Sequence, residues 1–334
     1  MFAMEVDGIK YDGFVSASVS RSLENFSGIF NFSATNIPGE PFPIKIGATC
    51  KIVVDDEIIM DGFIEAINVS YDIDQHLIQI SGRDKTADLV DSQIGGVNIE
   101  FTQPNVSFKS LVEKVLSILG ISNIEFIQRD EIKDFGDGEI ESASSGQTAF
   151  DFLETYARKR QIVLTTDGSG NIVARKSPEG TYSTILSSKK NSKATILSAS
   201  FKFDVSKRFN RYQVISSDNL SSYTDVKSKP AEKSANVQSK IIIDDQIRKT
   251  RLYAFVPDQS CDETQATDQA KWEAAYRQSK SLVYNVTVQG FKPENDINIW
   301  LPNNIVTILD DYAALYGQML ITGVIYNYSV DEGS

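Results

Sequence analysis

The strongest constraint on the fold is a change of hydrophobic period at Ser81–Ile94, which reads SGRDKTADLVDSQI. Before this stretch apolar and polar residues alternate, as in Gln75–Ile80, which is the period of a half-buried β-strand. After it apolar residues recur at helical spacing. Gly82 permits the backbone to end a strand, and Asp84 or Lys85 then opens a short helix. We interpret the stretch as the exit from an N-terminal β domain, although an ordinary surface corner has the same spacing.

Residues 1–95 are predicted to form the first β domain. Asp7-Gly8 is typical of a hairpin turn between two short strands. Phe14–Ser22 alternates apolar residues with serines, and a second hairpin is expected at Asp55-Asp56. This pattern predicts a half-buried antiparallel sheet or barrel.

Residues 96–176 are predicted to form a small α+β domain. Apolar residues recur at helical spacing through Phe108–Leu119, and a second amphipathic helix is expected at Thr148–Lys159. The segment Ile162–Arg175 contains the turn sequence D-G-S-G-N and predicts a hairpin. Helices and short strands together favour an α+β insert in a mainly β protein.

Residues 177–334 return to a β pattern. The part from about 216 to 260 is largely polar and predicts a long exposed loop. A helix is expected at 262–280, followed by the strand Leu282–Val288. We interpret this region as a second β domain.

The two β regions resemble each other, which indicates an internal duplication. Cys50–Asp72 and Ile305–Asp331 each run an apolar strand into an Asp-Asp turn, then a glycine, Gly62 or Gly317, and a second strand. Two unrelated hairpins with acidic turns would also look alike. If the duplication is real, three copies of the chain supply six similar units. Closed rotational symmetry then favours a pseudo-sixfold trimer.

The total charge and the apolar runs exclude several functions. Lys+Arg 33 against Asp+Glu 45 gives −12, which disfavours a chain-wide nucleic-acid surface but allows a locally basic patch. No apolar run approaches the roughly 18 residues that span a bilayer. Residues 1–13 lack the pattern of a signal peptide, so synthesis in a cytoplasm is expected. The turn at 167–171 lacks the G-K-[ST] of a phosphate-binding loop.

No catalytic, cofactor-binding or metal residues are predicted. The single histidine, His76, lies in an alternating strand without a nucleophile motif. Cys50 and Cys261 neither support nor exclude a disulfide, and buried thiols are expected. Asp55-Asp56 and Asp310-Asp311 could indicate a calcium site or a glycosidase pair, but adjacent carboxylates in turns favour solvated turns.

Four motifs in order carry a resemblance to a known family. They are GRDKTADLVD at the predicted corner, SSGQTAFDFL before the second helix, AKWE before the strand YNVTVQG, and LPNNIVTILDD followed by GQMLITGVIY. Together they resemble the baseplate hub proteins of contractile-tailed bacteriophages, above all tail protein P of Mu-like phages and the late-control D group. The resemblance covers most of the chain.

This resemblance implies a structural virion protein. Such hubs are homotrimers in which two tube-like antiparallel β-barrel domains, related by internal duplication, form a pseudo-hexameric ring. The ring joins the sixfold tail tube to the threefold central spike and contacts other baseplate proteins. DNA passes through without specific binding. The resemblance implies assembly in the bacterial host cytoplasm, a place in the tail baseplate and no membrane insertion. Family members often continue beyond the point at which this chain ends.

Three segments are candidates for contacts in such an assembly. Strands Phe14–Ser20 and Leu282–Val288 are candidates for inter-subunit contacts, and helix Asp262–Lys280 is a candidate outer support. The rival interpretation is a carbohydrate-binding or hydrolytic β protein of a tail or cell surface. In that case Trp300, Tyr312 and Tyr316 would stack on sugars, although core and turn packing explain the same aromatics.

Overall fold

The computed structural model describes residues 2–35, 43–72, 76–97, 99, 101, 105–136, 139–140, 142–189, 196–217, 236–256, 263–294, 296 and 298–330. The chain forms two compact units. The first consists of Met1–Ile196 together with Val288–Ser334, and the second of Leu197–Thr287. Strand residues make up 43% and helical residues 17%, so the predicted mainly β class is confirmed. The predicted boundaries at residues 95 and 176 stay a prediction.

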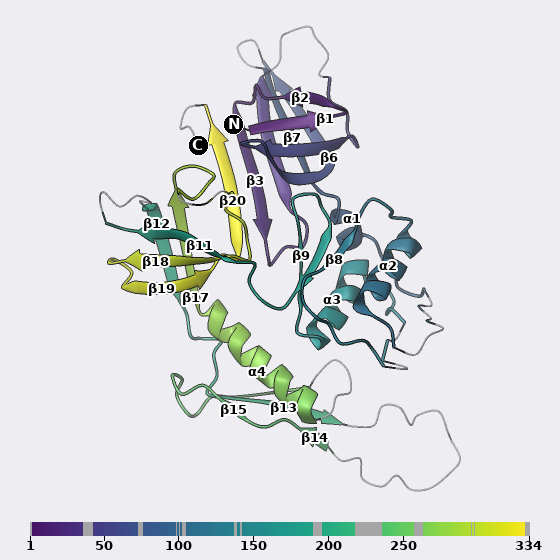
Figure 1. Ribbon diagram of the computed structural model, residues 1–334, viewed down its shortest axis with the longest axis vertical. Coiled ribbons are helices and arrows are strands. Elements are labelled where there is room, and N and C mark those ends of the chain that lie inside the picture. The colour runs from purple at the N-terminus through teal and green to yellow at the C-terminus, as the bar shows by residue number, and fades with distance from the viewer. Residues whose placement is uncertain are drawn as a thin grey trace. The chain divides into compact units, whose positions relative to one another are not determined.

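The first unit contains an eight-stranded antiparallel sheet that curls into a half-barrel (Figure 1). Its alternating apolar residues are buried on one face, as the period of two predicts; Phe30, Phe32 and Ile52 are among them. In sheet order the strands are β2 (Ile9–Tyr11), β1 (Phe2–Val6), β5 (Thr49–Val54), β6 (Glu57–Tyr71), β7 (His76–Asp84), β4 (Ile29–Thr35), β3 (Ser16–Ser22) and β20 (Gly323–Ser329).

Both predicted hairpin turns of this sheet are confirmed. Asp7 and Gly8 have φ values of 49° and 79°, and Asp55 and Asp56 have 48° and 67°. Positive φ at both central residues of a two-residue turn matches the right-handed twist of the flanking strands. Gly, Asn and Asp tolerate this conformation best, which is why Asp-Gly and Asp-Asp predict the turns.

The α+β module lies in the first unit. Its helices are α1 (Ala87–Asp91), α2 (Phe108–Leu119) and α3 (Ala149–Lys159), and its sheet has the order β8 (Phe126–Gln128), β10 (Ile172–Arg175), β9 (Val163–Thr166). The side chains of Ser107 and Thr148 cap α2 and α3 by accepting hydrogen bonds from Ser110 N and Asp151 N. Gly120 ends α2 at φ 69°. The two predicted helices and the predicted hairpin are thus confirmed.

The predicted duplication into two barrels is not confirmed, because the segment Ile305–Asp331, predicted as the second copy of Cys50–Asp72, divides between two sheets. In the first copy β6 is one long strand with an irregular register between Ile64 and Ala66. In the second copy the chain leaves the strand after Leu320. β19 (Leu315–Leu320) pairs with β18 (Ile305–Asp310), which pairs with β11 (Thr181–Ser187). β20 instead pairs with β3 of the first sheet (Figure 1).

The second unit is built around α4 (Glu263–Lys280). The helix packs on β13 (Arg211–Ser217) through the fully buried Val214, Ala266 and Ala270. The region predicted as a loop, about 216–260, contains the end of β13 and three short strands, so the prediction is wrong for these strand residues. Residues 218–235 and 257–262 lie outside the described part. The further strands are β14 (Asn236–Gln238), β15 (Ile242–Ile243), β16 (Leu252–Phe255), β12 (Ile196–Phe203) and β17 (Leu282–Val288).

Candidate functional site

Asp84 is the centre of the corner at which the first sheet ends. Its carboxylate is buried and accepts hydrogen bonds from Ser27 Oγ at 3.0 Å, Gly28 N at 2.8 Å and Thr86 N at 3.0 Å, as well as from Thr86 Oγ1. Burial raises the pKa of this carboxyl, and the hydrogen bonds from Thr86, Gly28 and Ser27 oppose the rise. The carboxylate therefore ties the segment before β4 to the start of α1.

Gly82 and Arg83, which precede Asp84 in β7, determine how closely β7 packs against β6 and β4. A Cβ atom on Gly82 would lie 2.6 Å from Phe30 Cζ and closer still to the Phe63 carbonyl oxygen. Only glycine fits between β4 and β6 at this position. Arg83 binds both Glu65, at 2.7 Å, and Asp91, at 2.5 Å. The hydrogen bond from Arg83 lowers the pKa of Asp91.

Lys85 and the turn of the β9–β10 hairpin fasten the α+β module to the sheet. Lys85 Nζ lies 3.2 Å from the Asp61 carboxylate and donates to the Asn123 carbonyl at 3.1 Å. A Cβ on Gly168 would overlap the carbonyl oxygen of Ile58 in β6. The corner is therefore held by an ion pair, a hydrogen bond and a close backbone approach.

The structure places the side chains considered for catalysis in strand β7 and in two separate hairpin turns. His76 stacks on Tyr71, with 5.9 Å between ring centroids. Asp55 and Asp56 are exposed, as solvated turns require. Asp310 is buried and accepts hydrogen bonds from the backbone of its own turn, so the solvated interpretation is wrong for this residue. Among the described residues no three His, Cys, Asp or Glu side chains are placed to hold a metal ion.

Cys50 is a core side chain of β5. Cys50 is a free buried thiol, and burial together with the charge of Asp61 raises its pKa to about 12. A thiol with so high a pKa is a poor nucleophile. Cys261 lies outside the described residues.

The three aromatics of the carbohydrate interpretation do not form a common platform. Trp300 is buried against Tyr182, with 4.9 Å between ring centroids. Tyr312 is 93% exposed, and Tyr316 is exposed with its hydroxyl 3.1 Å from Asp311 Oδ1. Trp300 is thus core, and only the two tyrosines at the β18–β19 turn are accessible.

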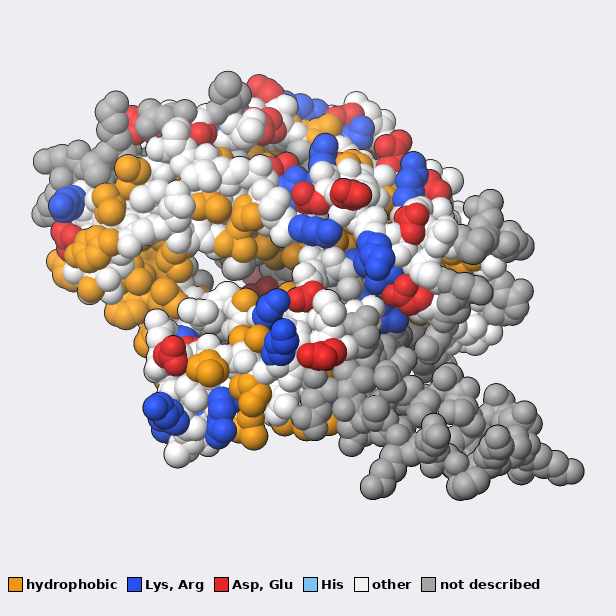
Figure 2. Space-filling view, turned by 60° about the horizontal axis from the view of Figure 1, so that its bottom comes forward, with side chains coloured by type: hydrophobic (Ala, Val, Ile, Leu, Met, Phe, Trp, Pro, Cys, Tyr) orange, Lys and Arg blue, Asp and Glu red, His pale blue; other side chains and the backbone are white. Residues whose placement is uncertain are grey.

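The β12–β17 pair presents apolar side chains to solvent. Leu197, Phe201 and Phe203 lie at alternating positions of β12, on one side of the strand, and are 60%, 53% and 64% exposed. A two-stranded sheet is marginally stable alone in water, and exposed apolar patches mark interaction surfaces. On the face shown in Figure 2, hydrophobic side chains gather in patches. We call these three residues and their pair of strands the apolar ribbon.

The two outer strands of the eight-stranded sheet provide a second exposed surface, besides the apolar ribbon. The sheet ends at β2 and β20, which carry the exposed Ile9 and Ile325. Unpaired strand edges readily accept another chain. The candidate Phe14–Ser20 is placed differently, because β3 uses both of its edges on β4 and β20. A contact through this strand would use side chains, and its role stays a prediction.

Sequence reasoning named β17 as a contact strand but missed β12. The alternation of Leu197, Phe201 and Phe203 was visible in the sequence and indicates an apolar strand face. It does not say whether that face is covered within the chain. No helix in the described part of the chain is long and apolar enough to cross a membrane.

Comparison with known proteins agrees with this architecture. Residues 2–84 match the N-terminal domain of the Mu phage baseplate assembly protein GpP-like family, and residues 262–334 match the fourth domain of the GpP family. Baseplate hub protein gp44 of Escherichia phage Mu is 23% identical over 327 residues, which cover 96% of this chain and 82% of that protein.

Two solved structures share the fold. The 43 kDa tail protein of prophage MuSo2 from Shewanella oneidensis has a TM-score of 0.80 at 24% identity, covering 99% of this chain and 95% of that one. A tail protein from Neisseria meningitidis MC58 has a TM-score of 0.77 at 17% identity, covering 99% and 93%.

The fold and the domain matches together show a mainly β chain that is similar to phage tail proteins. Within that class the chain is similar to the baseplate proteins of Mu-like phages, because its two ends match the first and fourth domains of the GpP family. The resemblance indicated by the four sequence motifs is confirmed.

Proposed function

We propose that this protein is a structural baseplate hub whose copies form a homotrimeric, pseudo-hexameric ring. The ring adapts the sixfold tail tube to the threefold central spike, contacts other baseplate proteins and surrounds the passage of DNA. Assembly takes place in the bacterial host cytoplasm. We assign no catalytic role and no cofactor.

The observation that carries the proposal is the apolar ribbon. Leu197, Phe201 and Phe203 are all more than half exposed in the single chain. Covering each by a neighbouring copy would contribute on the order of 1–2 kcal/mol. The open edges at β2 and β20 add surface that ring closure would cover.

Two further features support parts of the proposal. The proposed pseudo-sixfold symmetry rests on the likeness between the β5–β6 hairpin and the β18–β20 segment. The pairing of β6 is irregular between Ile64 and Ala66, and the later segment is interrupted between β19 and β20. The formal charge of −12 suits a passage that repels DNA. The name of the Mu relative, a baseplate hub protein, is consistent with the role.

Electron microscopy of the purified chain and two variants tests the proposal. We expect wild-type particles with threefold symmetry and a central hole. The double variant Phe201→Ser/Phe203→Ser should lose them, while Tyr312→Ser, which also removes an exposed aromatic, should keep them. The proposal would be contradicted if micrographs of the wild-type protein showed only single chains, or if the double variant still formed rings.

The carbohydrate interpretation retains one supporting observation, the exposed Tyr312 and Tyr316 on one turn. A glycan array separates it from the hub. Binding that Tyr312→Ser abolishes would favour the rival, whereas no binding leaves the hub as the only supported function.

A further inference from the structure

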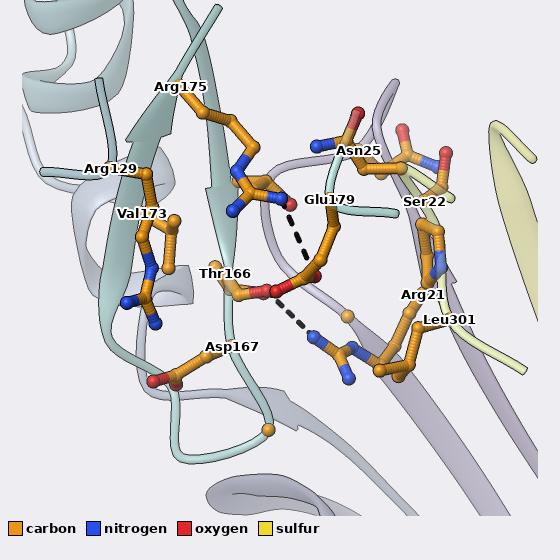
Figure 3. A pocket seen from close by; sticks show the side chains of 15 residues that line it. Arg21, Ser22, Asn25, Arg129, Thr166, Asp167, Val173, Arg175, Glu179 and Leu301 are labelled. Atoms are coloured by element: carbon orange, nitrogen blue, oxygen red, sulfur yellow. Dashed lines mark hydrogen bonds and ion pairs between the residues drawn. The ribbon is translucent and has the colours of Figure 1, made fainter. Parts of the chain in front are cut away.

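A pocket of about 150 Å³ lies within the first unit and is lined by three arginines (Figure 3). Arg21 belongs to β3 of the eight-stranded sheet, Arg129 follows β8, and Arg175 is the last residue of β10. Residues 301–303, which precede β18, line the same pocket. Four segments that are separate in sequence therefore meet around it.

Two of the guanidinium groups are buried. Arg21 and Arg175 are each 8% exposed. Arg21 Nη2 donates to the neutral carbonyl oxygen of Thr166 at 2.7 Å, and Figure 3 shows the two arginines facing this point from opposite sides. The acceptor that Arg21 contacts is thus a neutral carbonyl oxygen and not a carboxylate. A buried charge without a counter-charge is costly, so this arrangement favours an anion.

Arg175 is only partly neutralised. Its Nη1 lies 3.6 Å from Glu179 Oε2, which is longer than a hydrogen bond, and the Glu179 side chain is half exposed. The Nε atom of Arg175 is buried and has no acceptor in the described part of the chain. An unsatisfied buried donor of this kind is rare in folded proteins.

The other acid of the pocket is engaged elsewhere. Asp167 Oδ1 accepts from Ser169 N at 2.8 Å and from Asn171 N at 2.9 Å, and Oδ2 accepts from Asn171 Nδ2 at 3.1 Å. These hydrogen bonds hold the β9–β10 turn. The lining thus has three guanidinium groups and two carboxylates, one of which is committed to its turn.

We propose that this pocket binds a compact oxyanion, either inorganic phosphate or the side-chain carboxylate of an acidic residue on a partner tail protein. Guanidinium forks bind both groups through charge-assisted hydrogen bonds. The pocket volume equals that of about five water molecules, which accommodates either group. The ligand would bridge the sheet, the α+β module and the segment before β18. The inference is independent of the ring.

Thermal unfolding and calorimetric titration of the full-length protein test the proposal. The two probes are inorganic phosphate and N-acetyl-aspartate amide, which presents a single carboxylate, each against chloride at equal ionic strength. A ligand that binds the folded state raises Tm with its concentration. The variants are Arg175→Gln and the exposed Arg129→Gln, with Arg158→Gln as control because it removes the same charge from an exposed site on α3.

We expect saturable binding of at least one probe, weakened about tenfold by Arg175→Gln and by a smaller factor in Arg129→Gln, and unchanged in Arg158→Gln. The tighter probe identifies the source of the anion. If Arg175→Gln fails to fold, Arg129→Gln decides. The proposal would be overturned if neither probe raised Tm more than chloride does. It would also be overturned if the probes bound Arg129→Gln and Arg158→Gln equally well.

Discussion

Replacement of Gly82 by alanine should strongly destabilise the first sheet. Gly82 pairs with Phe30 on one side and with Ile64 on the other, so it has a strand close by at both edges. The added methyl group would lie 2.6 Å from Phe30 Cζ and closer still to the Phe63 carbonyl oxygen. The Phe30 ring is fully buried and a backbone oxygen cannot rotate away, so the strands themselves must move apart.

The magnitude follows from two costs. Overpacking a filled core costs about 1–3 kcal/mol. Separating β6 from β7 weakens about two ladder hydrogen bonds, each contributing about 0.5–1.5 kcal/mol. We therefore expect a loss of about 3 kcal/mol, which for a unit of this size lowers Tm by about 6–12 °C.

Differential scanning calorimetry measures this effect, and Gly13→Ala is the matched control. Gly13 has no atom within 4 Å of the added Cβ and a φ outside the left-handed region, so the same chemical change should alter stability by less than about 0.5 kcal/mol. If Gly82→Ala unfolds at the same temperature as Gly13→Ala, the close approach at the corner is refuted.

Two further predictions concern charged groups. Arg83 lowers the pKa of Asp91. The ionised Asp91 therefore stabilises the fold at pH values above the pKa of an ordinary aspartate, and this stabilisation is lost as the pH falls through the folded-state pKa of Asp91. NMR titration should show a higher pKa for Asp91 in Arg83→Gln, and an unchanged pKa would refute the interaction. Arg208→Met leaves the largely buried Asp244 without its 2.8 Å partner and should destabilise the second unit by about 3–5 kcal/mol. Hydrogen exchange should quicken in β13; protection equal to wild type would contradict this.

Local patterns in the sequence predicted most of the elements. Period-two alternation gave the strands of the first sheet, and helical spacing with Ser107 and Gly120 at its ends gave α2. The partner of β20 could not be predicted, because it pairs with β3 more than 300 residues away. The strands within 236–256 are short and lack alternation, so composition alone indicated a loop.

The candidate sites were less predictable than the elements. The corner was found from its spacing, but two of the donors to Asp84 come from Ser27 and Gly28, which no local pattern connects to it. Likewise, Arg21 and Arg175 belong to separate sheets and line the same pocket, so their proximity can be recognised only from the structure. Of the apolar ribbon, β17 was predicted as a contact strand and β12 was not. Periodicity reveals an apolar strand face, but it does not show whether another segment covers that face.

The most direct test of the ring is the solution mass of the purified chain, measured by multi-angle light scattering at two protein concentrations. The account predicts a mass of three times 37.0 kDa at both concentrations, because the apolar ribbon and the open sheet edges need a neighbouring copy to cover them. A mass of 37.0 kDa at both concentrations would contradict self-assembly of the ring.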